Sequence, residues 1–333
     1  MIMKKISIII LLGFAITTCK QNRNKDPETN PEFTKETLQI SDTTTTIYGN
    51  YVDDSYQKRK EGYDWVAVTV KENVDNAIFI SVRSRADKKD PTCTFDAKAY
   101  KNDKNTYESI YDGKKIIYKF SENSIHISSE NKEDEKILYF FCSGGATLAG
   151  TYTKINEALD TAQVDKTNFS KVLNFQNVGF NVSAIEKDGK NILTVFTFGL
   201  KEKDYNESFD LEGYHVIDAE VEDLNSDGSP ELFIFTQSPG SGSYGNVLAF
   251  SVNNMKSMSQ VYFPSTAENK KINSGYMGHD EFAILETYLV QRFPIYNEDD
   301  SNSNPTGGTR QVSYKLVEGE AMRKLEVNSI SNY

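Results

Sequence analysis

The sequence has no block of basic residues beyond its first few positions, and its 333 residues carry a formal net charge of −11. An acidic surface repels a phosphate backbone, so we expect no nucleic-acid partner. Histidine is also scarce: the chain has only His126, His215 and His279, which are scattered. No HExxH motif and no cysteine–histidine pair at ligand spacing occurs, so structural roles are expected for all three.

The familiar catalytic motifs are missing as well. The sequence contains no GxSxG motif, no phosphate-binding P-loop and no dinucleotide-binding glycine pattern. Carboxylate pairs are numerous, but a chain with 48 acidic residues contains such pairs by composition alone. We therefore expect a protein that is not an enzyme. A hydrolase whose site assembles from residues distant in the sequence is the alternative.

The N-terminus carries a targeting signal. Lys4 and Lys5 precede an apolar run that ends near Ile16 and is too short to cross a bilayer, so residues 1–18 are interpreted as a secretory signal peptide. The residues Ile-Thr-Thr-Cys at 16–19 resemble the lipobox of bacterial lipoproteins, and this resemblance implies that Cys19 is lipidated. It also implies anchoring in the cell envelope, at the periplasmic or surface face of the outer membrane. An ordinary signal peptide with a chance cysteine is the alternative.

Cysteine is rare, with three residues in the chain. Once Cys19 is lipidated, Cys93 and Cys142 form an even pair in an oxidising compartment, which favours a disulfide between them. Two free buried thiols are the other interpretation.

The rest of the chain divides by composition. Residues 19–44 are polar and turn-rich, which indicates a flexible tether. Short strand-like runs at spacings near 8–12 residues predict a small β-barrel or sandwich over 45–155, sealed by pairing of its first and last strands. Residues 156–168 read as a linker, and 169–333 as an antiparallel β-sandwich, so the expected fold class is all-β.

The second β region has its own charge and hydrophobic pattern. Residues 165–333 hold 14 basic and 24 acidic residues, a net charge of 14 − 24 = −10, so an electrostatic partner should meet this part. Alternation over 215–223 predicts that Ile217, Ala219 and Val221 share one face of a strand. Continuous apolar runs at 231–237 and 246–252 predict strands covered on both faces.

One acidic loop has the pattern of a cation site. Asp223, Asn225 and Asp227 stand at alternate positions, and Gly228, whose conformational freedom suits a sharp turn, follows them. Glu231 takes the last ligand position. Oxygen ligands that converge on a tight loop suit Ca²⁺, the one cofactor that the sequence suggests, and the loop resembles the short calcium loops of β-propeller repeats. A plain hairpin turn rich in Asp, Asn and Gly is the other interpretation.

A second loop contains almost no bulky side chains. Residues 236–250 read TQSPGSGSYGNVLAF, in which glycine, serine and proline surround the single Tyr244 between two apolar runs. A turn needs only two to five residues, so the surplus is either a flexible connector or a thin projection. In a projection, tyrosine supplies a rigid anchor with few rotamers to immobilise.

Four stretches carry a resemblance to a known family. They are the segments at 219–252, 275–286, 289–296 and 304–321, which include the loop above and the sequence GYMGHDEFAILE. Over about residues 165–328 the chain is similar to the periplasmic inhibitors of invertebrate-type lysozyme. The resemblance implies an antiparallel β-sandwich that can pair as a homodimer. It further implies a protruding Ser-Gly-x-Tyr loop that enters the lysozyme cleft.

Carried onto this sequence, the resemblance assigns the inhibitory loop to Ser241, Gly242, Ser243 and Tyr244. The hydroxyl of Ser241 is expected to bind a catalytic carboxylate of an invertebrate-type lysozyme or related muramidase, with Tyr244 packed alongside. Filling the space between the two catalytic carboxyl groups stops hydrolysis without chemistry by the inhibitor. A calcium-stabilised, non-catalytic binding module for an envelope glycan or protein is the alternative.

Overall fold

The computed structural model of the protein describes residues 46–73 and 76–333 and has an all-β fold, as predicted. The signal peptide, Cys19 and the tether all lie outside the described residues. Two short 3₁₀ helices, Asp54–Glu61 and Lys132–Asp134, and one helical turn, α1 (Ile137–Phe140), accompany the strands. No helix in this part of the chain is long and apolar enough to span a membrane.

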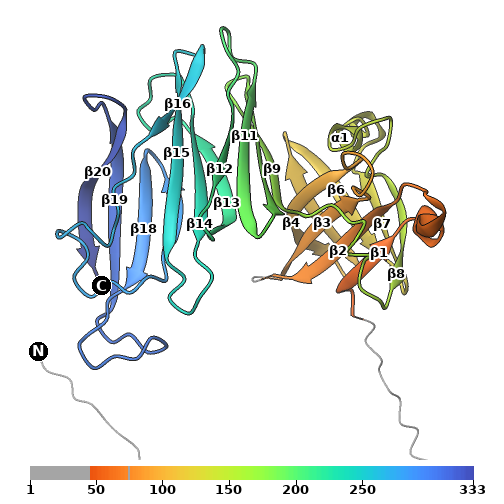
Figure 1. The fold of residues 1–333 in the computed structure, drawn as a ribbon, viewed down its shortest axis with the longest axis horizontal. Helices are drawn as coiled ribbons and strands as arrows, with labels where there is room; N and C mark the ends of the chain where they lie inside the picture. The colour runs from red at the N-terminus through yellow and green to blue at the C-terminus, as the bar shows by residue number, and fades with distance from the viewer. Residues whose placement is uncertain (1–45, 74–75) are drawn as a thin grey trace, which may run out of the picture. The chain divides into compact units, whose positions relative to one another are not determined.

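The first eight strands form a closed antiparallel barrel (Figure 1). They are β1 (Gly49–Val52), β2 (Val66–Glu72), β3 (Ala77–Ser84), β4 (Thr94–Asp103), β5 (Thr106–Tyr111), β6 (Lys114–Phe120), β7 (Ser124–Ser129) and β8 (Gly150–Ile155). The predicted pairing of first and last strands is confirmed, because Tyr51 of β1 lies opposite Val68 on one side and Lys154 of β8 on the other. Each barrel strand pairs with a neighbour on both sides, although β4 and β5 pair only between 100–103 and 106–108. Alternate side chains fill the interior.

The predicted disulfide between Cys93 and Cys142 is confirmed. Their Cα atoms are 4.2 Å apart, and the bond joins the residue before β4 to the segment that follows α1. Cys93 is fully buried against the barrel core. The bond therefore fixes the α1 segment to the barrel wall.

Reduction of this bond is expected to destabilise the protein by about 4 kcal/mol in the chain-entropy model, because the two cysteines are 49 residues apart. Urea unfolding with and without reductant measures the difference. A Cys93→Ala/Cys142→Ala variant should unfold like the reduced protein and show no response to reductant. Equal stability of the oxidised and reduced wild type would contradict the expectation.

The remaining strands form three four-stranded antiparallel sheets (Figure 1). The first contains β9 (Thr167–Phe175), β10 (Val178–Lys187), β11 (Lys190–Phe198) and β12 (Asn206–Asp210). The second contains β13 (His215–Glu222), β14 (Glu231–Gln237), β15 (Gly245–Asn253) and β16 (Ser257–Val261). The third contains β17 (Glu281–Leu285), β18 (Tyr288–Pro294), β19 (Thr309–Val317) and β20 (Lys324–Asn332).

The second sheet is the middle layer of a stack. Leu232 and Ile234 of β14 pack against the first sheet, whereas Phe233 and Phe235 pack against the third. This confirms the prediction that the apolar runs at 231–237 and 246–252 are strands covered on both faces. Strands buried on both faces make a rigid base for the loops that connect them.

The alternation predicted along β13 is wrong at Ile217. Ala219 is fully buried and Val221 partly so, but Ile217 is 42% exposed. A register shift between Val216 and Asp218 interrupts the pairing with β14, so Val216 takes the inward position instead. One extra residue in a strand reverses the facing of the residues before it, and an alternation pattern does not reveal such a bulge.

The segment 156–168, predicted to be a linker, contacts the first β region through two side chains. Leu159 and Val164 contact a small cluster around the buried Tyr56 and Trp65. Val164 forms an isolated β-bridge with Arg85, and β9 already begins at Thr167. The described residues from 46 to 333 belong to one compact unit.

Candidate functional site

The Ser-Gly-rich loop joins β14 to β15, the two best-buried strands of the middle sheet. Their pairing runs to Gln237 opposite Gly245, so residues 238–244 form the loop. Its ends are closed by two hydrogen bonds: the amide of Ser238 donates to the carbonyl of Tyr244 (2.8 Å), and the amide of Tyr244 donates to Oγ of Ser238 (2.9 Å). The loop therefore has a defined internal geometry before any partner binds.

Two neighbouring loops hold one side of this loop. The amide of His279 donates to the carbonyl of Gly242 (2.7 Å), and Nδ2 of Asn302 donates to the carbonyl of Ser241 (2.7 Å). Gly278 has a φ of +88°, and a Cβ atom there would lie 2.1 Å from the carbonyl oxygen of Gly242. Only glycine permits this close approach. The hydrogen bonds favour a fixed loop over the flexible connector that the sequence left open.

A buried polar network lies at the base of the loop. The carboxylate of Asp280, 3% exposed, accepts hydrogen bonds from the amide of Gly245 (2.7 Å), the hydroxyl of Tyr276 (2.6 Å) and Nε2 of Gln291 (2.6 Å). Gln291 in turn accepts a hydrogen bond from the hydroxyl of Tyr314 (2.6 Å). Burial raises the pKa of Asp280, although these hydrogen bonds oppose the rise. Such a satisfied network fixes the start of β15 in one position.

The outer edge of the loop is exposed. Tyr244 keeps 40% of its surface accessible, and its ring makes a T-shaped contact with that of Tyr276 at a centroid distance of 5.7 Å. Ser241 is exposed, and its hydroxyl has no hydrogen-bond partner among the described residues. The amide of Ser243 donates to the carbonyl of Gly240 (3.1 Å), which tightens the turn between them. A hydroxyl and a phenol are thus presented together on a supported backbone.

Three residues that hold the loop were not singled out as site residues from the sequence. His279 was assigned a structural role, and its backbone does contact the loop while its side chain lies near Tyr296 and Asn302. Asp280 and Asn302 reach the loop from segments 35 and 61 residues away. Asp280 lies within the stretch 275–286 that carries the family resemblance, and Asn302 lies two residues before the stretch 304–321. That resemblance was the only available signal for them.

The acidic loop before β14 is closed by its own hydrogen bonds. Asp223 accepts from the amides of Asp227 (3.0 Å) and Gly228 (2.9 Å), and Asn225 contacts the side chain of Asp227 (2.9 Å). Glu231 is buried and accepts from the amide of Leu224 (2.9 Å). Within the described residues, no group of three or more His, Cys, Asp or Glu residues is arranged to hold a metal ion.

Arg323 brings a positive charge to this acidic loop. Its guanidinium lies 3.0 Å from Asp227 and 3.7 Å from Glu231, and it donates to the hydroxyl of Ser251 (2.6 Å). Ser251 donates in turn to Glu231 (2.6 Å). Arg323 therefore compensates part of the acidic charge that a cation would otherwise balance, while Ca²⁺ binding by the loop stays a prediction.

Glu231 is expected to make stability depend on pH. Burial raises its pKa from 4.5 to about 7. Between these values the folded state binds more protons than the unfolded state, so stability falls as the pH rises through this window. We expect Glu231→Gln to remove this loss, which amounts to roughly 3 kcal/mol between pH 4 and 8. Urea unfolding at several pH values tests it, and identical profiles for variant and wild type would contradict it.

Comparisons with known proteins add little to this geometry. No family model and no curated protein matches the sequence. Among solved structures, the Bombyx mori GH32 beta-fructofuranosidase BmSUC1 is similar at a TM-score of 0.30 and 8% sequence identity. The similarity covers 80% of this chain and 60% of that chain, so the chain spans less than two thirds of the enzyme's length. A likeness this weak carries no argument about function.

Proposed function

We propose that this protein inhibits a lysozyme by inserting the loop 238–244 into the active-site cleft of the enzyme. The observation that carries the proposal is the exposed pair Ser241 and Tyr244 on a backbone held by Gly278, His279 and Asn302. A loop that is already ordered loses little conformational entropy on binding, so more of its contact energy contributes to affinity. Inhibition by occlusion requires no catalytic residue in this chain.

Charge near the loop supports a cationic target. Glu298, Asp299 and Asp300 lie on the same connection as Asn302, and the first two are exposed. Hydrogen bonds from the amides of Asn297 and Thr306 lower the pKa of Asp300, so its carboxylate is ionised at neutral pH. Together with the net −10 of residues 165–333, these groups would steer a basic lysozyme toward the loop.

A panel of lysozymes tests the proposal. Purified residues 20–333 are assayed against chicken-type, goose-type and invertebrate-type enzymes with a bacterial cell-wall substrate. We expect inhibition of the invertebrate-type enzyme or a related muramidase at a ratio near one to one. Full activity of all three enzymes at a large molar excess of the protein would refute the proposal.

We further propose that lipidation of Cys19 tethers the inhibitor in the cell envelope. This proposal depends on the lipobox resemblance of residues 16–19, which lie outside the described residues. Fractionation of cells that express wild type or Cys19→Ala tests it. The wild type should be found with membranes and the variant should be released. Membrane association of both proteins would contradict the tether.

A further inference from the structure

A groove separates the barrel from strand β9, and a buried ion pair fixes its walls. The guanidinium of Arg83 contacts Asp96 at 2.7 Å, and the two side chains are 8% and 4% exposed. Nε of Arg83 also donates to the carbonyl of Thr167 (2.6 Å), while the amide of Ser170 donates to Asp96 (2.9 Å). These bonds connect β3 and β4 to β9, so the groove is a fixed feature.

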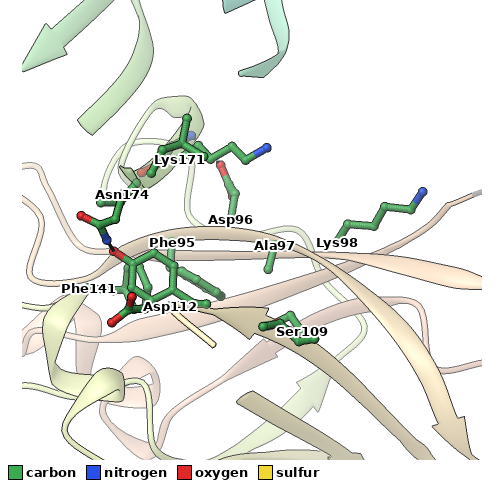
Figure 2. Close-up of a pocket in the computed structure, with 14 residues that line it drawn as sticks. Phe95, Asp96, Ala97, Lys98, Ser109, Asp112, Phe141, Lys171 and Asn174 are labelled. Atoms are coloured by element: carbon green, nitrogen blue, oxygen red, sulfur yellow. Dashed lines mark hydrogen bonds between the residues drawn. The ribbon is translucent and has the colours of Figure 1, made fainter. Parts of the chain in front are cut away.

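Two adjoining cavities form the groove. The first, about 380 Å³, lies between β4, β5 and β9, and Figure 2 draws its lining side chains. The second, about 390 Å³, lies past α1 and over β10 and Phe198. They share Phe141, Ser170 and Val172. Each volume falls within the range of roughly 300–1,000 Å³ typical of ligand sites.

Aromatic rings line the groove where the two cavities meet. The ring of Phe141 lies 4.9 Å from that of Tyr111 and 5.3 Å from that of Phe140, between ring centroids. Phe140 is 52% exposed, and Phe198 also lines the second cavity. A partly exposed cluster of flat rings offers faces on which another flat or C–H-rich surface can pack.

Polar groups lie among these rings. Asn174 donates to the hydroxyl of Tyr111 (3.1 Å) and, with Asp112, lies on one side of the first cavity (Figure 2). Oδ1 of Asp96 is buried and has no hydrogen-bond partner among the described residues. Asn181, which is exposed, adds a side-chain amide in the second cavity. The accessible amide and carboxylate groups beside the rings can pair with the polar groups of a ligand.

The charges on the groove cancel. In the first cavity Asp96 is paired with Arg83 and Lys171 with Asp218, which leaves Lys98 and Asp112, one charge of each sign. Among the described residues, no Lys, Arg, Asp or Glu lines the second cavity. A strongly charged ligand therefore finds no net attraction here.

We propose that this groove binds a neutral oligosaccharide of pyranose rings. The axial C–H faces of a sugar ring pack on aromatic rings such as Phe140, while sugar hydroxyl or acetamido groups bond to carboxylate, amide and hydroxyl groups. Two cavities in a row fit consecutive sugar units of one chain. The site shares no residue with the loop 238–244, and sugar binding does not depend on that loop.

Calorimetric titration of residues 20–333 with chitohexaose and with cellohexaose tests this site. These neutral probes differ in the presence of acetamido groups. We expect at least one of them to bind, and Phe140→Ala to weaken that binding about tenfold. Asn181→Ala, a second exposed position in the groove, should weaken it as well.

Tyr262→Ala is the matched control, because Tyr262 is 54% exposed and lies outside the residues that line the groove. It should bind the sugars like the wild type. Failure of both oligosaccharides to bind would overturn the proposal, as would equal binding by the wild type, Phe140→Ala and Asn181→Ala.

Discussion

Replacing Ser241 and Tyr244 together by alanine is expected to weaken inhibition of the sensitive lysozyme by more than about 2 kcal/mol, or roughly 30-fold in the inhibition constant. Ser241 supplies the free hydroxyl, and Tyr244 supplies the ring that would pack in the cleft. The loss should appear mainly as faster dissociation, because the acidic surface that steers encounter is unchanged. Inhibition assays and surface plasmon resonance with the double variant measure both effects.

The double variant should remain folded, since Tyr244 is 40% exposed and the Ser241 hydroxyl makes no hydrogen bond with the described residues. A matched control is Tyr262→Ala/Ser265→Ala, which removes an exposed tyrosine and an exposed serine elsewhere on the surface. The control should inhibit like the wild type. Unchanged inhibition by the Ser241/Tyr244 variant would eliminate the loop as the inhibitory element.

Arg83→Ala is expected to have the second large effect, a loss of folding stability. This change leaves the Asp96 carboxylate buried without its cation and removes hydrogen bonds to the carbonyls of Thr167 and Phe95. Breaking a buried ion pair in this way typically costs about 3–5 kcal/mol of folding stability. Urea unfolding of the variant, compared with the wild type at pH 7, measures the loss.

Lys89→Ala is the matched control, because Lys89 and Asp64 form an ion pair in which both side chains are about half exposed. Solvent screens that pair, so its loss should cost less than about 1 kcal/mol. Combining Arg83→Met with Asp96→Leu should restore much of the stability lost in Arg83→Ala. Equal losses for Arg83→Ala and Lys89→Ala would contradict the assigned role of the buried pair.

Much of the fold could be predicted because strands and turns have characteristic local sequence patterns. Turn residues and apolar runs indicated the barrel strands, and the even cysteine count indicated the Cys93–Cys142 bond. The doubly covered β14 followed from its continuous apolar run at 231–237. The bulge at Ile217 was missed because its cause is the register against β14, which no property of β13 alone reveals.

The candidate loop could be recognised in the sequence, but the residues that hold it in place could not. Glycine, serine and one tyrosine between two strands marked residues 238–244, whereas Asp280 and Asn302 meet the loop only through the tertiary fold. In the same way, Arg323 lies 96 residues from Asp227 in the sequence. The groove beside β9 could not be predicted from the sequence either, because its walls come from the barrel and from a separate sheet.

The central claim is that Tyr244 enters the catalytic cleft of a lysozyme, and site-directed photocrosslinking tests it most directly. Tyr244 is replaced by the photoreactive residue benzoylphenylalanine, the protein is irradiated with the sensitive lysozyme, and the adduct is mapped by mass spectrometry. We predict crosslinks to peptides that line the cleft around the catalytic carboxylates. Crosslinks confined to the outer surface of the lysozyme, or equal crosslinking from position 262, would contradict the account.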